Sequence, residues 1–201
     1  MNLSGVTFRG PELVESLLLS ELPTGYANLL RQINGFIAFD GGFHLRGVCD
    51  TPTWHSLSEA WRGASALHRL FPAVHDSDLP FGQDCMGDQF LLRDSVVHKL
   101  SAEAGELSSM SLSFREFFNG LTADPFEFLQ LHPLAQFQRD GGHLEPGQLL
   151  AAYPPFITKE AANGVTLRAI SAGERVAFLA DMARQLAGIP DGGQFRVVFT
   201  E

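Results

Sequence analysis

The feature that most constrains this chain is a run of short predicted strands joined by very short turns. The strands expected in this run span residues 81–84, 88–92, 95–100 and 107–110. Cys85-Met86-Gly87, between the first two strands, is typical of a hairpin turn, and Gly105 provides a turn before the last strand. The centre of the chain is therefore expected to form a hairpin followed by two more strands.

Apolar residues at helical spacing predict helices on either side of these strands. The helices expected span residues 11–20, 25–33, 57–70, 114–119 and 172–187, and another begins at Asp124-Pro125. Three helices begin with the capping-box pattern, a Ser followed three residues later by a Glu. These pairs are Ser56 with Glu59, Ser113 with Glu116 and Ser171 with Glu174. Asn119-Gly120 is expected to end the helix that begins at residue 114.

The remaining segments are short strands or are rich in turn residues. Further strands are expected over 43–48, 148–153, 165–170 and 194–200. The rest of 132–164 contains many Pro and Gly residues and predicts turns. The last strand, helix and strand are interpreted as an addition to the main core rather than a separate domain.

Length and composition indicate a single globular domain over residues 1–201. The 201 residues are 45% hydrophobic and 18% charged, so the chain can bury a core without disulfide or metal cross-links. No apolar run approaches the 18 residues of a membrane span. The two cysteines, Cys49 and Cys85, form no disulfide framework, and the first residues lack a signal-peptide pattern. A cytoplasmic protein is therefore expected.

Negative charge is concentrated in the middle of the chain. The formal net charge is -9, and residues 76–145 alone carry twelve acidic and four basic residues. Such a chain is unsuited to non-specific binding of nucleic acid or anionic membranes, both of which need a basic surface. Basic partners stay possible, and the acidic residues form either a recognition surface or a solvated surface.

The usual sequence patterns of enzymes and metal sites are absent. The chain has no phosphate-binding Gly-rich loop, no nucleophile elbow and no His-Glu-x-x-His motif. The seven histidines include no helical i, i+4 pair, and the cysteines form no Cys-x-x-Cys pair. We therefore expect no catalytic residues, no metal and no cofactor. An enzyme would require a deep pocket in which side chains such as His44 and Asp84 converge.

Four aspartates lie in and just before the predicted hairpin, at positions 76, 78, 84 and 88. Carboxylates beside an exposed turn are expected to be solvated, and Asp88 could bond the turn backbone instead. Trp54 precedes a helix cap, where it either packs at the helix entrance or forms an exposed anchor. Cys49 is interpreted as a small apolar residue.

The order of three motifs resembles that of the SUKH superfamily. The first helical pair ends in Leu30-Arg31-Gln32-Ile33-Asn34-Gly35-Phe36. The hairpin reads Pro80-Phe81-Gly82-Gln83-Asp84-Cys85-Met86-Gly87-Asp88-Gln89-Phe90-Leu91-Leu92, and Ser113-Phe114-Arg115-Glu116-Phe117-Phe118 resembles the closing helix of the family. The resemblance covers a core of about residues 11–130, and the extension of about 131–201 lies outside it.

The resemblance implies an α+β fold, with a mainly antiparallel sheet packed against helices and a C-terminal strand–helix–strand extension. It also implies a non-enzymatic role, because many bacterial members neutralise toxins, often nucleases or deaminases. The fungal relatives regulate cell-wall synthesis. The matching positions have a structural character and do not map a binding site. They are Gly35, Gly82, Gly87, Asp88 and Phe114.

Charge and resemblance together predict an immunity protein that binds a cognate, basic protein toxin. An acidic inhibitor associates rapidly with a nuclease, whose substrate is a polyanion. The alternative is a regulatory or scaffolding module of an endogenous complex, such as one in cell-wall synthesis. The predicted partner-binding residues are Asp76, Asp78, Asp84, Asp88 and Trp54.

Overall fold

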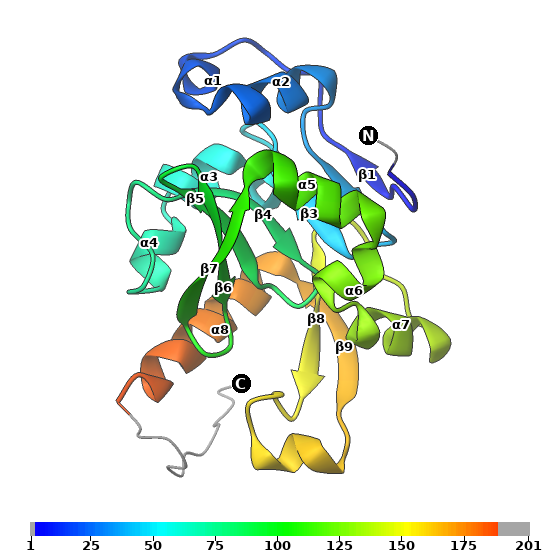
Figure 1. Ribbon diagram of the computed structural model, residues 1–201. Helices are drawn as coiled ribbons and strands as arrows, with labels where there is room; N and C mark the ends of the chain where they lie inside the picture. The colour runs from blue at the N-terminus through cyan, green and yellow to red at the C-terminus, as the bar shows by residue number, and fades with distance from the viewer. Residues whose placement is uncertain (1–2, 189–201) are drawn as a thin grey trace.

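The computed structural model describes residues 3–188 of the 201-residue chain (Figure 1). Within these residues the main sheet has seven antiparallel strands, and each pairs with the next one along the chain. The strands are β1 (Phe8–Arg9), β2 (Phe36–Ala38), β3 (Phe43–Leu45), β4 (Leu79–Asp84), β5 (Gln89–Arg93), β6 (Val96–Ser101) and β7 (Glu106–Ser113). A second sheet pairs β8 (Gln148–Tyr153) with β9 (Thr166–Ser171). The α+β class and the antiparallel sheet are confirmed.

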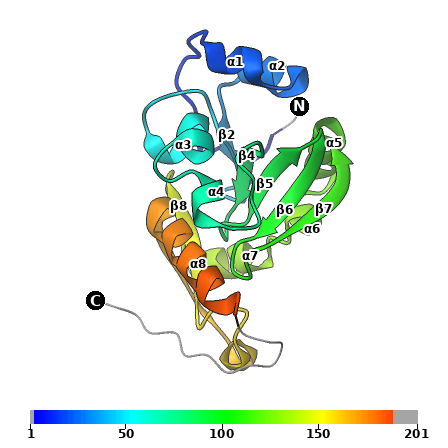
Figure 2. The same cartoon turned by 90° about the vertical axis from the view of Figure 1, so that its left-hand side faces the viewer.

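Helices lie on both faces of the main sheet. They are α1 (Leu17–Glu21), α2 (Thr24–Gln32), α3 (Leu57–Arg62), α4 (Leu67–Leu70), α5 (Phe114–Ala123), α6 (Pro125–Leu129), α7 (His132–Arg139) and α8 (Ala172–Leu186). Two short 3₁₀ helices, η1 (Thr53–His55) and η2 (Lys159–Asn163), complete the set described. Figure 2 shows α5 on one side of the strands and α4 and α8 on the other.

Alternate residues of β5 pack in two hydrophobic clusters, one on each face of the sheet. Phe90 and Leu92 belong to the first cluster, which includes buried residues of α2 and α5. Leu91 belongs to the second, with buried residues of α4 and α8. This is the two-residue period of a strand. Because both faces are covered, Gln89, a polar residue of this strand, is fully buried.

Phenylalanine rings form the centre of the first cluster. The Phe117 ring centroid on α5 lies 4.9 Å from that of Phe90, 5.3 Å from that of Phe81 and 5.8 Å from that of Phe43. All four residues are fully buried. Tilted and edge-to-face rings at these distances attract beyond their area burial. The aromatic contacts therefore fix α5 on β3, β4 and β5.

Residues 144–186 of the C-terminal extension, here called the C-terminal unit, pack on the main sheet. Leu144 and Leu150 join the first cluster, and Leu179 of α8 joins the second. The Leu150 N–H donates to the Cys85 carbonyl in the β4–β5 turn at 2.8 Å. The predicted strands at 148–153 and 165–170 and the helix at 172–187 match β8, β9 and α8. The strand expected at 194–200 lies outside the described residues.

Two helix predictions are wrong in part: one helix starts later than expected, and another is divided in two. The helix expected over 11–20 begins only at Leu17. Gly10 continues the β1 pairing by donating to the Gly35 carbonyl, and the Pro11 carbonyl accepts from Asn34 Nδ2 instead of a helical N–H. The helix expected over 57–70 is interrupted after Arg62, where the Glu59 carboxylate accepts the Ser65 N–H instead of completing the capping box. The chain there divides into α3 and α4.

Local chemistry explains the other differences. α5 continues through Gly120 to Ala123 rather than ending at Asn119-Gly120, and Asp124 then caps α6 by accepting the Glu127 N–H. α7 was expected to be a turn, although Pro133 suits the first turn of a helix. The Ser113–Glu116 capping box is complete in both directions. Strands β1 and β2 span two and three residues, too few for a periodic signal.

None of the helices described for residues 3–188 combines the length and the apolarity that a bilayer crossing requires.

Gly87 tests how closely the C-terminal unit contacts the hairpin turn. Its φ is +98°, and a Cβ there would lie 2.9 Å from Leu179 Cδ1. We expect Gly87→Ala to lower the free energy of unfolding by about 2 kcal/mol, through backbone strain and displacement of α8. The control is Gly173→Ala in α8, where a Cβ meets nothing within 4 Å and stability should hold or rise by up to about 1 kcal/mol. Urea unfolding measures both, and an unaffected Gly87→Ala would contradict this packing.

Candidate functional site

A row of polar side chains crosses the α8-facing side of the sheet. His44 on β3, Gln83 on β4 and Gln89 on β5 are register neighbours across three strands. Their exposed fractions are 4%, 3% and 0%. Together with Arg46 and His55 they form what we call the polar seam. The alternation of Phe43-His44-Leu45-Arg46 is that of a strand with one solvated face, but here both faces are covered.

The Arg46 guanidinium is the charged centre of the seam. Nη1 donates to the carbonyls of Pro80 and Gly82 at 3.1 and 3.3 Å. Nη2 donates to Oε1 of Gln83 at 2.9 Å and to Oε1 of Gln89 at 2.6 Å. Burial lowers the pKa of Arg46 to about 10, so the group stays charged at neutral pH. Four neutral oxygens solvate this buried cation.

His44 and His55 form a hydrogen-bonded relay. His44 Nε2 lies 2.8 Å from His55 Nδ1, and His55 Nε2 lies 3.0 Å from the Asn34 carbonyl oxygen. A carbonyl can only accept, so His55 carries its proton on Nε2. Its Nδ1 then accepts from the Nε2–H of His44. This order leaves His44 Nδ1 as an unprotonated acceptor.

Both imidazoles are held neutral. Burial is the main cause that lowers the pKa of His44, and the neighbouring His55 and Arg46 lower it further. Burial also lowers the pKa of His55, with Arg46 adding to the effect and the bond to the Asn34 carbonyl opposing it. At neutral pH the seam therefore contains one charge, on Arg46, and a relay with fixed tautomers.

The β4–β5 turn is organised around Asp84. Its Oδ1 accepts the backbone N–H groups of Met86, Gly87 and Asp88 at 2.9, 3.1 and 3.1 Å. Lys99 Nζ lies 3.5 Å from Asp84 Oδ2 and 2.9 Å from Asp88 Oδ2. Burial, followed by the Asp88 carboxylate, raises the pKa of Asp84 to about 7, against the opposing effects of Lys99 and the backbone amides.

These contacts correct two expectations about the hairpin. The turn is covered by the C-terminal unit, since Arg175 Nε donates to the Met86 carbonyl at 3.2 Å. Asp84, only 4% exposed, is therefore not a solvated carboxylate, and it is Asp84 that bonds the turn backbone. Asp88 is partly exposed, and its Oδ1 accepts the Ala102 N–H at 2.9 Å.

Two of the predicted partner-binding aspartates are buried. Asp78, 2% exposed, accepts from Arg93 at 2.7 and 2.8 Å and from the His75 N–H at 2.8 Å. Burial alone would raise the pKa of Asp78. The hydrogen bonds from Arg93 and the His75 N–H together outweigh burial, so the pKa lies below its ordinary value. The prediction that Asp78 and Asp84 contact a partner at the surface is therefore wrong, because both side chains are buried. Asp76 is exposed.

Trp54, the fifth predicted partner residue, lies beside the relay. It is half-buried, and its ring centroid lies 4.9 Å from that of Phe8 and 5.4 Å from that of His44. A Cβ on Gly147 would lie 2.8 Å from the indole Nε1, so the C-terminal unit also contacts this ring. These contacts fit packing at the helix entrance rather than a free anchor.

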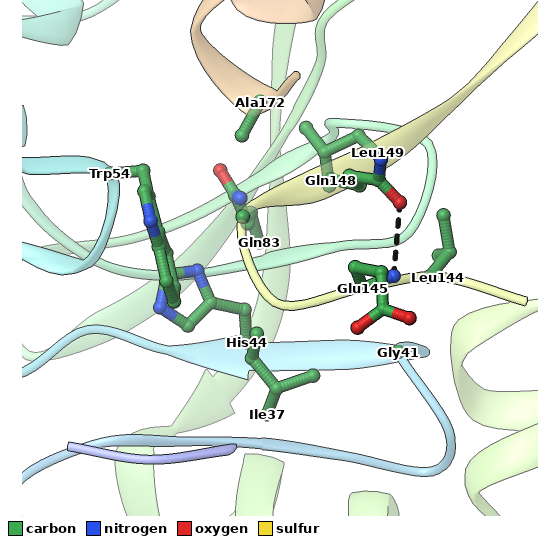
Figure 3. Close-up of a pocket in the computed structure, with 11 residues that line it drawn as sticks. Ile37, Gly41, His44, Trp54, Gln83, Leu144, Glu145, Gln148, Leu149 and Ala172 are labelled. Atoms are coloured by element: carbon green, nitrogen blue, oxygen red, sulfur yellow. Dashed lines mark hydrogen bonds between the residues drawn. The ribbon is translucent and has the colours of Figure 1, made fainter. Parts of the chain in front are cut away.

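A small hollow lies where the seam meets the C-terminal unit (Figure 3). His44, Gln83 and Trp54 line it from the main sheet and η1, and Gln148 and Ala172 are among the residues that line it from the C-terminal unit. Its free volume is about 10 Å³. Asp84 does not line it, so the convergence of His44 and Asp84 in a deep pocket that an enzyme would need is not found there.

Exposed acidic side chains instead gather on the helices that follow β7. They are Glu116, Asp124, Glu127, Asp140 and Glu145. Between residues 114 and 147 the only basic residues other than histidine are Arg115 and Arg139. Phe126, 37% exposed, lies among them with its ring against His132. We call α5, α6, α7 and the loop to Glu145 the acidic helical surface; the three helices follow one another along one side of the molecule (Figure 1).

Comparison with known proteins gives no assignment: no protein-family model and no curated protein matches the chain. Among residues 3–188, no three His, Cys, Asp or Glu side chains gather as a metal-binding group would require.

Paired substitutions separate buried from exposed aspartates. Asp84→Ala removes the acceptor of three backbone N–H groups, and we expect it to lower the free energy of unfolding by about 3 kcal/mol or more. Asp76→Ala, at an exposed site, should change stability by no more than about 0.5 kcal/mol. Urea unfolding at pH 7 measures both. Equal effects of the two substitutions would contradict the structural role of Asp84.

The relay predicts a dependence of stability on pH. Above the ordinary histidine pKa of about 6.5, the imidazoles are neutral in both folded and unfolded chains. At lower pH the histidines of the unfolded chain become protonated, whereas those of the folded seam stay neutral. The free energy of unfolding therefore falls. Relative to His44→Phe, the wild type should lose about 1.4 kcal/mol of unfolding free energy for each pH unit below that value.

Urea unfolding of the wild type and His44→Phe from about pH 7.5 to about pH 5 tests this. Taking the difference between the two proteins cancels the titration of Asp84, which acts in the opposite direction because the pKa of that group is raised. A difference that stays constant over this range, or that grows in favour of the wild type in acid, would show that His44 is not held neutral.

Proposed function

We propose that this chain acts by binding a basic protein, and that it is an immunity protein of the SUKH type that neutralises a cognate toxin. The acidic helical surface is the observation that carries the proposal. Five exposed carboxylates against two arginines give it a negative potential, and Phe126 adds an apolar contact. Interfaces of this kind gain association rate and specificity from complementary charge.

The proposed contact surface excludes most of the hairpin. Four of the twelve acidic residues in 76–145 form ion pairs with bases of the chain itself: Asp78, Asp84, Asp88 and Glu103. Their charge is largely neutralised internally. Most of the other eight lie on the acidic helical surface, where Glu145 Oε1 lies 2.8 Å from His143 Nε2, and exposed Asp76 is a further candidate contact.

A toxin nuclease is the partner class that best fits this chemistry. An enzyme that binds a polyanionic substrate has a basic surface around its active site. An acidic protein docked there blocks the substrate without any catalytic step of its own. A cytoplasmic location and one-to-one binding without turnover are part of this proposal.

The proposal predicts that a neighbouring gene encodes the toxin, and co-expression of the two genes tests it. The wild-type chain should restore growth, and the purified pair should bind with a Kd that rises with salt concentration. Glu127→Lys, Asp140→Lys and Glu145→Lys combined should raise the Kd at least about tenfold, which corresponds to about 1.4 kcal/mol. The salt dependence of the triple variant should be weaker than that of the wild type.

The matched control reverses three exposed charges elsewhere: Glu12→Lys, Asp50→Lys and Glu160→Lys. It changes the net charge equally and should leave the Kd within about threefold of the wild type. Equal losses in both triple variants would show that net charge, not this surface, drives binding. Failure to restore growth, with capture of cell-wall synthesis proteins instead, would favour the regulatory alternative.

A further inference from the structure

Two polar atoms of the seam make no hydrogen bond within the described part of the chain. His44 Nδ1 has a free lone pair, because Nε2 carries the proton and donates a hydrogen bond in both histidines of the relay. Gln83 Nε2 is left as a donor because Gln83 Oε1 accepts both from Arg46 and, at 3.3 Å, from Gln89 Nε2. One atom is an acceptor and the other a donor, and both side chains are more than nine-tenths buried.

Both residues line the hollow at the junction with the C-terminal unit. In Figure 3 the His44 ring and the Gln83 amide lie on the sheet side, with Trp54 beside them and the Ala172 methyl group above Gln83. Gln148 lies opposite, with its Oε1 accepting the Glu145 N–H at 3.0 Å. The lining thus combines an acceptor, a donor and an aromatic wall.

The size of the hollow selects its occupant. A cavity needs about 10–15 Å³ of free volume and two to four polar partners to hold a water molecule. This hollow provides about 10 Å³ and the two atoms just described. A cation is disfavoured, because Arg46 already places one positive charge in the seam. An anion is disfavoured, because the His44 lone pair and the exposed Glu145 carboxylate line the hollow.

We propose that the hollow binds one water molecule, which donates a hydrogen bond to His44 Nδ1 and accepts one from Gln83 Nε2. This water completes a chain of hydrogen bonds that runs from the Asn34 carbonyl through His55 and His44 to Gln83 and Arg46. It also lies against Ala172 at the start of α8, so it fills the contact between the main sheet and the C-terminal unit. The proposal is independent of the proposed function.

A crystal structure of the full chain, at a resolution that places water, is the direct test. We expect one water within about 2.7–3.2 Å of both His44 Nδ1 and Gln83 Nε2. A dry hollow, or the Gln148 amide turned in to meet these atoms, would overturn the proposal.

Nitrogen NMR of the wild type gives a second test that needs no variant. His44 should be the Nε2–H tautomer, with an Nδ1 that is unprotonated and hydrogen-bonded, and should show magnetisation transfer from water. A proton on Nδ1 at neutral pH would reverse the relay and overturn the site.

An isosteric pair at Ala172 tests the energetic role of the water. Thr and Val at this position displace the water with the same volume, but only Thr supplies a hydroxyl group to the two polar atoms. We expect the unfolding equilibrium constant to be about tenfold larger for Ala172→Val than for Ala172→Thr. Equal stability of the two variants would show that His44 Nδ1 and Gln83 Nε2 need no hydroxyl partner there.

Discussion

The buried Arg46 guanidinium is the interaction around which the rest of the structure is arranged. A charge removed from water must be compensated by hydrogen bonds within the protein. Here the oxygens come from β4 and β5, and the β4–β5 pairing is irregular between Pro80 and Gly82, whose carbonyls accept from Nη1. The Tyr26 hydroxyl donates to the Arg46 carbonyl at 2.7 Å, which ties α2 to the same residue.

That requirement explains why the α8-facing side of the sheet is polar at its centre. Gln83 and Gln89 accept from Arg46, and each then has an amide group to satisfy. Gln89 donates to the Gly87 carbonyl at 2.6 Å, which connects the seam to the turn that Asp84 organises. Arg175 of α8 donates to the preceding carbonyl of this turn, that of Met86. Sheet, turn and C-terminal unit thus form one hydrogen-bonded system.

Local patterns predicted the elements well where the signal was local. The turn sequence Cys85-Met86-Gly87 gave the β4–β5 hairpin, and the apolar stripe with a Ser cap gave α8. The burial of Asp84 could not be predicted in this way, because it depends on a helix almost ninety residues further along the chain. The burial of His44 and Arg46 could not be predicted either, because their alternation with apolar residues is typical of a strand with one solvated face. The charge count correctly located an acidic third of the chain, but it could not separate carboxylates with internal partners from those on α5–α7.

The contacts between the C-terminal unit and the hairpin make them one cooperative structure, which leaves the acidic helical surface as the face for a partner. Native-state hydrogen exchange of the full chain tests this most directly. We expect backbone amides in the centre of α8 to open with the same free energy as those of β4 and β5, because both unfold only together. Amides of α8 that open several kcal/mol more easily than those of β4 and β5 would contradict it.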